Sequence, residues 1–336
     1  MIVIDASVLK HLIIHSNGTK EQILKDAKCF SHHFLNFIIS YKIRFNCSKE
    51  NPLVIAVDRR GNIKNQDGTE TRNYWRQKYY NNEILLENEG YKGHRKKDDS
   101  TGIDWNTIET IFDSLLDVLD KFTDITVLKC TYLEADDIIS ICSDYYNKNK
   151  NDKNIIAITH DKDMNQIVNE DVKLYNPFTN KYTEIGMTEE EKTLFYLSGD
   201  AGDGVPPVKV KTREKSWLKL LKKKTLQQIF EEEPILAERF KINRKIMNLN
   251  VNNLPKKLVE IVVNKLNENN FTYKELFLIK ELKKFELSQF VESKHLAMDL
   301  RFKEFKLEEH GRKNINNNSS KNEFRTQKIL NEFKLY

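Results

Sequence analysis

Long apolar runs, a leader segment and paired cysteines are all missing from the sequence. No apolar run approaches the roughly 18 residues that a membrane span needs, and "MIVIDA" at the start has neither a basic leader nor a cleavage site. We therefore expect no membrane association and a cytoplasmic location, in the host cell if the chain is phage-encoded. The four cysteines form no C-x-x-C pair, which argues against a zinc cage and a disulfide framework and predicts reduced core thiols: Cys29, Cys47, Cys130 and Cys142.

A large charge of one sign is also missing, but the net charge of +5 conceals an uneven distribution. At 336 residues the chain is long enough for two or more packed units, because single domains mostly run to about 100 to 200 residues. We find no internal repeat.

Short apolar runs rich in Ile and Val alternate with longer segments of helical period. Four such runs predict strands, at 2–4, 53–57, 125–129 and 155–159, and helices are expected at 20–41, 105–121 and 134–149. This alternation is typical of a parallel sheet covered by helices on both faces. The prediction is an α/β domain over 1–185. It is interrupted at 59–100 by a polar insertion far longer than an ordinary connection of about 4 to 6 residues.

Only helical patterns follow the α/β domain. They are expected at 188–197, 215–222, 225–246, 255–267, 272–284 and 288–306, so the prediction for 186–310 is an all-helical region. The polar, low-complexity stretch "RKNINNNSSKN" then predicts a flexible tether and C-terminal tail over 311–336.

Acidic residues follow the predicted strands where each strand ends. Asp5, Asp58 and Asp161 do so directly or one residue later, and "YLEADD" places Glu134, Asp136 and Asp137 in the opening turn of a helix at the same edge of the sheet. Ligands of open α/β sheets bind at that edge. Glu134 and Asp137, three residues apart, share a helix face and are expected to meet the strand-end aspartates. Further acidic residues stand nearby: Asp163, and in the loop "GDAGDGVPP" Asp200 and Asp203.

Taken singly, each of these aspartates is explained as a helix cap. Taken together they repel, by about 4 kcal/mol for a pair ~4 Å apart at an effective dielectric of 20, so that the cluster needs protons or cations. Oxygen ligands without converging Cys or His favour Mg²⁺ or Mn²⁺ over zinc. Nine carboxylates suffice for two ions at the roughly 3.5–4 Å spacing used in phosphodiester cleavage.

Two basic regions could hold a polyanionic substrate. Residues 209–224 carry eight cations against one acidic residue, beginning with Lys209, Lys211, Arg213 and Lys215, and suit the backbone of a duplex. The alternative is a solvated lysine-rich helix face. In the insertion, Tyr74, Trp75 and Arg76 begin a mixture of rings and cations that suits single-stranded nucleic acid. The alternative there is that the rings pack the insertion onto the domain.

Seven motifs occur in order over roughly residues 1–300: "VIDAS", "AVDRR", "YWRQKYY", "YKGHR", "YLEADDII", "THDKDMNQ" and "GDAGDGVPPVKV". In this order they resemble the 5′→3′ exonuclease and flap endonuclease family, and within it the T-even phage type ribonuclease H. The resemblance implies a PIN-like nuclease domain with an arch-like insertion, and a helical region that binds duplexes. It also implies two Mg²⁺ ions, replaceable by Mn²⁺, held first by Asp5, Asp58, Glu134, Asp136, Asp137 and Asp161, and second by Asp161, Asp163, Asp200 and Asp203.

The resemblance also implies an activity. Lys92 and Arg95 match the family's basic pair at the base of the arch, which contacts the scissile phosphate, and Asp58 and Asp161 would be catalytic through the metals. The expected enzyme is a monomer that hydrolyses RNA–DNA or DNA duplexes near 5′ ends or flaps and removes RNA primers in phage lagging-strand replication. A sliding clamp and a single-strand DNA-binding protein are the implied partners.

Two segments depart from the family pattern or extend it. "PPVKVKT" replaces the glycine-bearing hairpin that often holds a potassium ion, so a duplex grip without K⁺ is expected here. The tail resembles part of a sliding-clamp peptide, through Gln327, Leu330 and Phe333, or is a terminal helix docked on the core. Two alternatives to the main function stay open: a non-catalytic duplex-DNA-binding replication protein, and a PIN-like endoribonuclease indifferent to structured 5′ ends.

Overall fold

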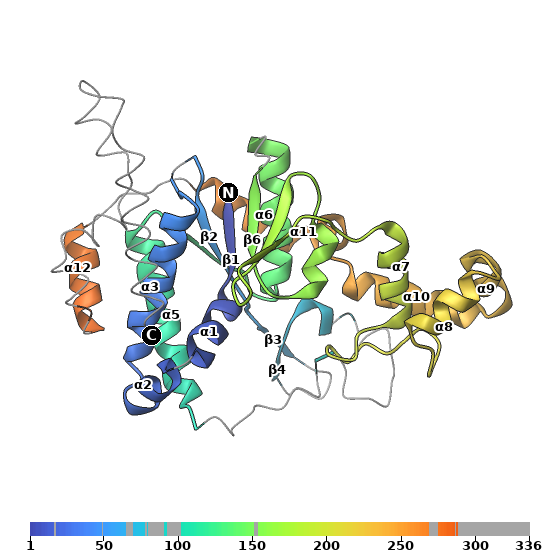
Figure 1. The fold of residues 1–336 in the computed structure, drawn as a ribbon, viewed down its shortest axis with the longest axis horizontal. Helices are drawn as coiled ribbons and strands as arrows, with labels where there is room; N and C mark the ends of the chain where they lie inside the picture. The colour runs from blue at the N-terminus through green and yellow to red at the C-terminus, as the bar shows by residue number, and fades with distance from the viewer. Residues whose placement is uncertain are drawn as a thin grey trace.

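A single mixed sheet organises the fold in the computed structural model, which describes residues 1–287 apart from 17, 49, 65–69, 78, 80–90, 93–101, 151–153, 269–274 and 286. Its six strands run in the order β5-β2-β1-β6-β7-β8 (Figure 1). They are β1 (Ile2–Asp5), β2 (Leu53–Val57), β5 (Thr126–Lys129), β6 (Ile155–Ile158), β7 (Val172–Asn176) and β8 (Lys181–Thr183). All neighbours pair in parallel except β7 and β8.

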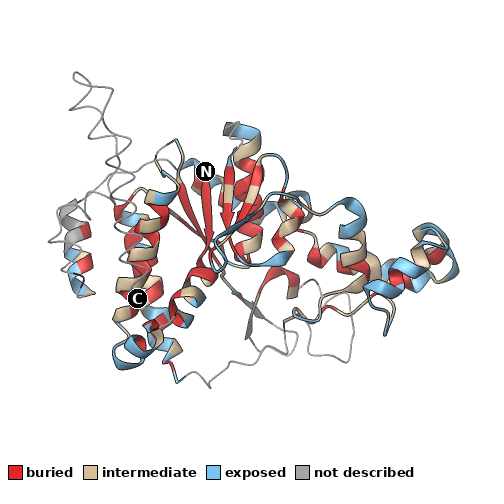
Figure 2. Cartoon of the chain, in the orientation of Figure 1, coloured by how far each residue is buried: buried red, intermediate tan, exposed pale blue. Residues whose placement is uncertain are grey.

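Helices cover both faces of this sheet, as predicted. On one face, Ile2 and Ile4 pack with helices α1 (Ala6–His15), α2 (Thr19–Lys25), α3 (Cys29–Arg44) and α5 (Trp105–Phe122). On the other, Val3 and Val54 pack with α6 (Ala135–Lys150) and α11 (Lys256–Asn267). Because both faces are covered, the central strands are buried throughout their length (Figure 2).

The structure corrects several predicted boundaries in the α/β part. Helix α1 was missed because it follows β1 without a connection, the side chain of Asp5 serving as its N-cap. The predicted helix 20–41 is two helices, α2 and α3. The short strands β7 and β8 were missed too, since β8 is largely exposed and has no apolar run. The insertion contains an antiparallel hairpin of β3 (Gly61–Lys64) and β4 (Glu70–Asn73), which was not predicted.

Helices dominate the rest of the described chain, as predicted. They are α7 (Glu189–Ser198), α8 (Glu214–Leu221), α9 (Leu226–Glu232), α10 (Pro234–Met247), the 3₁₀ turn η3 (Val251–Asn253), α11 and α12 (Glu275–Lys284). The predicted helix 225–246 is divided at Pro234, which starts α10 because proline fits the first turn of a helix and not its interior. Trp217 is fully buried in a small core between α7, α8, α9 and α10.

The helical region does not lie wholly apart from the sheet. Helix α11 packs on α6, and Leu278 and Leu282 of α12 join the core of α3 and α5. No described helix is long and apolar enough to cross a membrane. Two of the cysteines, Cys130 and Cys142, are buried free thiols, while Cys29 and Cys47 are half-buried. The predicted helix 288–306 and the tether and tail at 311–336 lie outside the described residues.

Candidate functional site

Three aspartates stand at the carboxyl edge of the sheet, where the sequence predicted them. Asp5 ends β1 and caps α1, accepting hydrogen bonds from the backbone N–H groups of Ser7 and Val8 at 2.9 and 3.3 Å. Asp58 follows β2 and accepts from Ser7 Oγ at 2.5 Å and from Ala135 N–H at 2.9 Å. These contacts join the beginnings of α1 and α6 to the edge of the sheet.

Asp161 and Asp163 follow β6 on a short 3₁₀ turn, η2 (Lys162–Ile167). Asp161 caps this turn and accepts the Asp163 N–H at 2.9 Å. Burial, then the charges of Asp161, Asp200 and Asp203, raises the pKa of Asp163 to about 7. Asp161 therefore caps a turn, and its carboxylate also faces other carboxylates.

The start of α6 and the residue before it present the three acidic residues of "EADD" in two directions. Glu134 and Asp137 share a face, as predicted, but that face meets Arg76 rather than the strand-end aspartates. Arg76 Nη1 donates to Glu134 Oε2 and to Asp137 Oδ2, both at 2.7 Å, and Nη2 donates to Asp137 Oδ1 at 2.5 Å. Trp75 Nε1 donates to Asp137 Oδ2 at 3.0 Å. Both oxygens of Asp137 are thus already bound within the protein.

Asp136 is the α6 carboxylate that meets the strand-end aspartates. Burial, then the charges of Asp161 and Asp5, raises its pKa well above the ordinary value. Burial and the charge of Asp58 likewise raise the pKa of Asp5 to about 7. The 100° rotation between adjacent helical residues separates the roles, because Asp137 binds Arg76 while Asp136 turns toward the sheet edge.

The glycine-rich loop supplies the last two aspartates. Gly199 has φ +65°, and a Cβ there would lie 2.5 Å from the carbonyl oxygens of Val205 and Pro206, so this position requires glycine. The turn that follows brings Asp200 and Asp203 to one small cavity, whose other acidic members are Asp136 and Asp163. Asp136, Asp163 and the pair Asp200 and Asp203 thus come from three different sequence motifs.

Tyr91 and Lys92 tie this loop to α6. Tyr91 OH donates to Glu134 Oε2 at 3.1 Å and to Asp203 Oδ2 at 3.0 Å. Lys92 Nζ forms an ion pair with Glu134 and lies 3.3 Å from Asp203 Oδ2. Burial acts against ionisation of Glu134, but Lys92 and Arg76 outweigh it and lower its pKa to about 2. Lys92 and Arg76 therefore pair with Glu134, and Arg76 also pairs with Asp137, although burial still raises the pKa of Asp137.

The remaining carboxylates fit a divalent cation. In the structure's described part, no three acidic, His or Cys side chains are already placed to hold one ion together. Asp5, Asp136 and Asp163, however, have raised pKa values and no ion pair of their own among the described residues. They need protons or bound cations to remain close, and their hard oxygens suit Mg²⁺ or Mn²⁺.

Replacing Asp163 by asparagine should stabilise the metal-free protein. The pKa of Asp163 is about 7 in the folded protein and 3.8 in the unfolded chain, so the folded state is favoured when Asp163 is protonated. This contribution to stability is complete below pH 3.8 and is lost as the pH rises through about 7. Urea unfolding in EDTA at pH 8 should therefore show Asp163→Asn more stable than wild type by roughly 1–3 kcal/mol. This advantage should shrink at pH 6 and disappear near pH 4. Asp117→Asn, at a side chain 74% exposed, is the control, and an advantage independent of pH would contradict the assignment.

Several residues of this site were missed in the sequence. Ser7 and Thr159 hold Asp58 and Asp5, and Tyr91 bridges two acidic residues. Tyr91 and Ser7 do lie inside the quoted motifs "YKGHR" and "VIDAS", but a hydroxyl next to a charged residue in sequence gives no indication that it bridges distant carboxylates.

The aromatic residues of the insertion are buried rather than displayed. Tyr74, Trp75 and Arg76 are 8%, 7% and 2% exposed. Their burial disagrees with the prediction that they stack on single-stranded nucleic acid and agrees with the alternative, packing onto the domain. Arg95 lies outside the described residues. Among the predicted duplex contacts, Lys209 is paired with Glu233 at 2.5 Å, whereas three are exposed: Lys211, Arg213 and Lys215.

A parallel sheet with helices on both faces and acidic residues gathered at its carboxyl edge defines a PIN-like nuclease fold. Residues 65–194 match the family model described as the 5′-3′ exonuclease, N-terminal resolvase-like domain. This match covers less than half of the chain and agrees with the 5′→3′ exonuclease and flap endonuclease family that its motifs resemble. No curated protein sequence matches the chain.

Solved structures show the same fold. A zinc-bound T5 5′-exonuclease is 13% identical, with a TM-score of 0.50, and the match covers 85% of this chain and 98% of that one. A bacteriophage T5 flap endonuclease in a pseudo-enzyme–product complex with DNA and metal ions is 12% identical, with a TM-score of 0.51 and the same coverage. At this identity the likeness establishes the fold alone.

Proposed function

We propose that this protein is a Mg²⁺-dependent 5′→3′ exonuclease and flap endonuclease. The observation that carries the proposal is the set of buried and half-buried carboxylates at the sheet edge without an ion pair among the described residues, in a chain that matches the 5′→3′ exonuclease family over residues 65–194. The T5 structures bound to metal ions and DNA support a divalent metal and a DNA substrate. Mn²⁺ would substitute for Mg²⁺, and we propose no role for K⁺.

Two groups of residues would hold the metals. Asp5, Asp58, Asp136 and Asp161 form the first group. Glu134 and Asp137 would support this group indirectly, through their ion pairs with Arg76 and Lys92. Asp161, Asp163, Asp200 and Asp203 form the second. When bound, Mg²⁺ supplies Lewis-acid chemistry to the scissile phosphodiester and activates water.

The residues of the chain itself position these groups and neutralise charge. Arg76 fixes the first turn of α6 and thereby the direction of Asp136. Lys92 lies beside Asp203 and Glu134, so its ammonium would supply positive charge near a phosphate bound at the second metal group. Arg95, three residues on, would add a second cation at that phosphate.

The biological task we propose is removal of RNA primers and adjacent DNA in phage lagging-strand replication, as for the T-even type ribonuclease H that the motifs resemble. The protein would act as a monomer in the cytoplasm, with a single-strand DNA-binding protein and a sliding clamp as partners. Clamp binding would use Gln327, Leu330 and Phe333.

The first test is turnover. A nicked duplex carrying a 5′-labelled RNA–DNA strand should release short 5′ products with Mg²⁺ and none with EDTA. Binding without cleavage would favour the non-catalytic DNA-binding protein. Equal cleavage of unstructured RNA without a 5′ duplex end would favour a PIN-like endoribonuclease.

Exposed cations on and before α8 should determine the salt dependence of duplex binding. Lys211, Arg213 and Lys215 are exposed and have no acidic partner in the described part of the chain, and α8 lies far from α12 (Figure 1). Because each phosphate contact contributes about −0.9 to the slope of log K against log [salt], replacing all three by glutamine should flatten that slope by about 2 to 3. Lys283→Gln on α12 is the control. An unchanged slope would assign these residues to a merely solvated face.

A further inference from the structure

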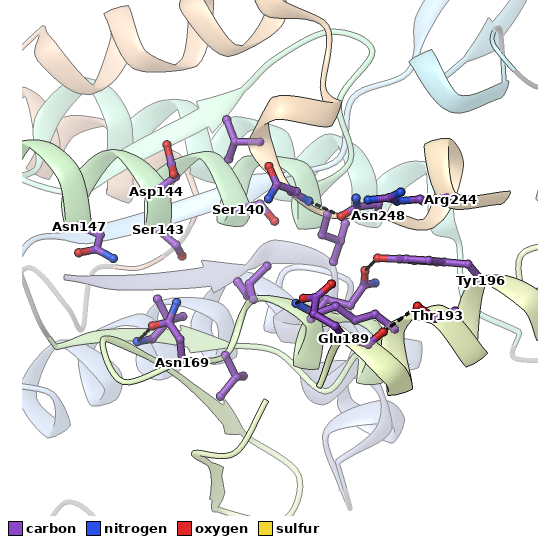
Figure 3. A pocket seen from close by; sticks show the side chains of 18 of the residues that line it. Ser140, Ser143, Asp144, Asn147, Asn169, Glu189, Thr193, Tyr196, Arg244 and Asn248 are labelled. Atoms are coloured by element: carbon purple, nitrogen blue, oxygen red, sulfur yellow. Dashed lines mark hydrogen bonds and ion pairs between the residues drawn. The ribbon is translucent and has the colours of Figure 1, made fainter. Parts of the chain in front are cut away.

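A second cavity, of about 530 Å³, lies away from the acidic site, between α6, the segment after η2, α7 and α10. Figure 3 shows Ser140, Ser143 and Asn147 along one side, Asn169 and Thr193 on the opposite side, and Arg244 beside Asn248 at one end. Its volume falls in the range of about 300–1,000 Å³ that is typical of small-molecule sites. Nothing in the proposed nuclease reaction uses it.

Three asparagine side chains on its walls present hydrogen-bond donors. The side-chain oxygens of Asn169, Asn248 and Asn250 each accept a backbone N–H, at distances between 2.8 and 3.0 Å. A backbone N–H can only donate, so the amide oxygen must face it and the NH₂ group must point elsewhere. Three amide NH₂ groups are thus available to a ligand.

Among the charged residues of the lining, only the guanidinium of Arg244 is left without a partner of opposite charge in the described part of the chain. Asp144 is paired with Lys148 at 2.7 Å, and Glu189 with Lys192 at 2.9 Å, each within its own helix. Arg244 is exposed. The cavity therefore combines one unpaired guanidinium with several neutral donors, and each of its two carboxylates already has a lysine partner.

Ser143 also belongs to the lining of the cavity. The residue is 5% exposed, so that its replacement by a larger side chain would reduce the space available to a ligand.

We propose that this cavity binds a phosphate monoester of about the size of a nucleoside monophosphate. Its phosphate oxygens lie against Arg244 and the amides of Asn248 and Asn250, and the remaining oxygens of the ligand meet Asn169. An acceptor-rich anion is the ligand chemistry that a surplus of donors and one unpaired guanidinium selects. This inference does not depend on nuclease activity.

The cavity and the acidic site must be kept apart in any test, because they are neighbours. Leu249 lines both cavities; Gln166 donates to Met247 O at 3.0 Å from one side, and Arg76 Nε donates to Ile246 O at 2.7 Å from the other. Binding is therefore measured on the full chain in EDTA, where phosphate cannot bind through a metal, and again on Asp161→Asn.

The experiment is calorimetric titration with three probes: inorganic phosphate, ribose 5-phosphate and AMP. One molecule of AMP should bind per chain, equally in Asp161→Asn, and more tightly than inorganic phosphate, because the rest of the nucleotide adds contacts that phosphate alone lacks. Equal affinity for the three probes would overturn the assignment of a ligand of nucleotide size. Arg244→Gln should weaken binding by about tenfold or more, since a charge-assisted hydrogen bond is lost.

Matched variants decide the location. Lys241→Gln removes an exposed cation from the same helix outside the cavity lining and should bind normally. Ser143→Leu places a larger side chain at the lining and should abolish binding, while Ser143→Ala should keep most of it; thermal unfolding checks that both are folded. No heat with any of the three probes, or undiminished binding in Arg244→Gln, would overturn the proposal. Neither result would bear on cleavage of the labelled duplex.

Discussion

Replacing Asp161 by asparagine is expected to reduce Mg²⁺-dependent cleavage of a 5′-labelled duplex by at least about a hundredfold. In our assignment Asp161 is the one carboxylate shared by both metal groups, and its charge is what each group would lose. Asparagine also caps helical turns, so the bond to the Asp163 N–H at 2.9 Å should survive. The variant should therefore fold normally and lose catalysis only.

The measurement is single-turnover cleavage at saturating Mg²⁺, together with duplex binding in EDTA. Duplex binding should stay within about twofold of wild type, because the cations on and before α8 are untouched. Asp117→Asn, on the exposed side of α5, is the matched control and should cleave normally. Cleavage by Asp161→Asn at the wild-type rate would remove Asp161 from the metal ligands and leave it as the cap of η2.

The strands and most helices could be predicted because their patterns are local. The runs at 53–57 and 155–158 are apolar throughout, since both faces of the sheet are covered, and no other regular structure suits so short a buried run. The edge strand β8 escaped because it is largely exposed, β7 because polar residues interrupt its apolar ones, and α1 because no turn separates it from β1. Each element that was not predicted depends on its structural neighbours more than on a local sequence pattern.

The acidic edge could be predicted for a topological reason, but the division of work within it could not. Parallel strands end at one edge, so Asp5, Asp58 and Asp161 had to approach one another. Which carboxylate of "EADD" joins them depends on Arg76, a residue 61 positions from Asp137 that occupies one face of the helix. No local sequence pattern indicates that Arg76 pairs with Asp137. A basic residue beside aromatic residues suggested a surface for nucleic acid instead.

Arg76 should also be the residue whose loss most destabilises the site. Its guanidinium is 2% exposed and donates to Glu134, Asp137 and Ile246 O, joining the segment after β4 to α6 and α10. Arg76→Met keeps much of the packing volume but leaves two buried carboxylates without that cation. Breaking a buried ion pair in this way costs about 3–5 kcal/mol, which urea unfolding at pH 7 in EDTA would measure.

A surface pair provides the comparison. Arg59 and Asp113 form an ion pair whose side chains are 29% and 39% exposed, so Arg59→Met should cost no more than about 1 kcal/mol. Equal losses for the two variants would mean that the burial of Arg76 carries no energetic consequence and would contradict its role in holding α6.

The pH dependence of the stability loss in Arg76→Met distinguishes a lost ion pair from lost packing. The pKa of Glu134 is lowered to about 2, so its ionic interactions stabilise the fold above the unfolded value of 4.5 and are lost as the pH falls toward 2. The difference between wild type and Arg76→Met should therefore be full at pH 7 and decline below about pH 4.5. A loss that stays constant with pH would be a packing effect. A declining loss would mean that Arg76 holds Glu134 ionised, leaving Asp136 as the member of "EADD" that is open to a metal.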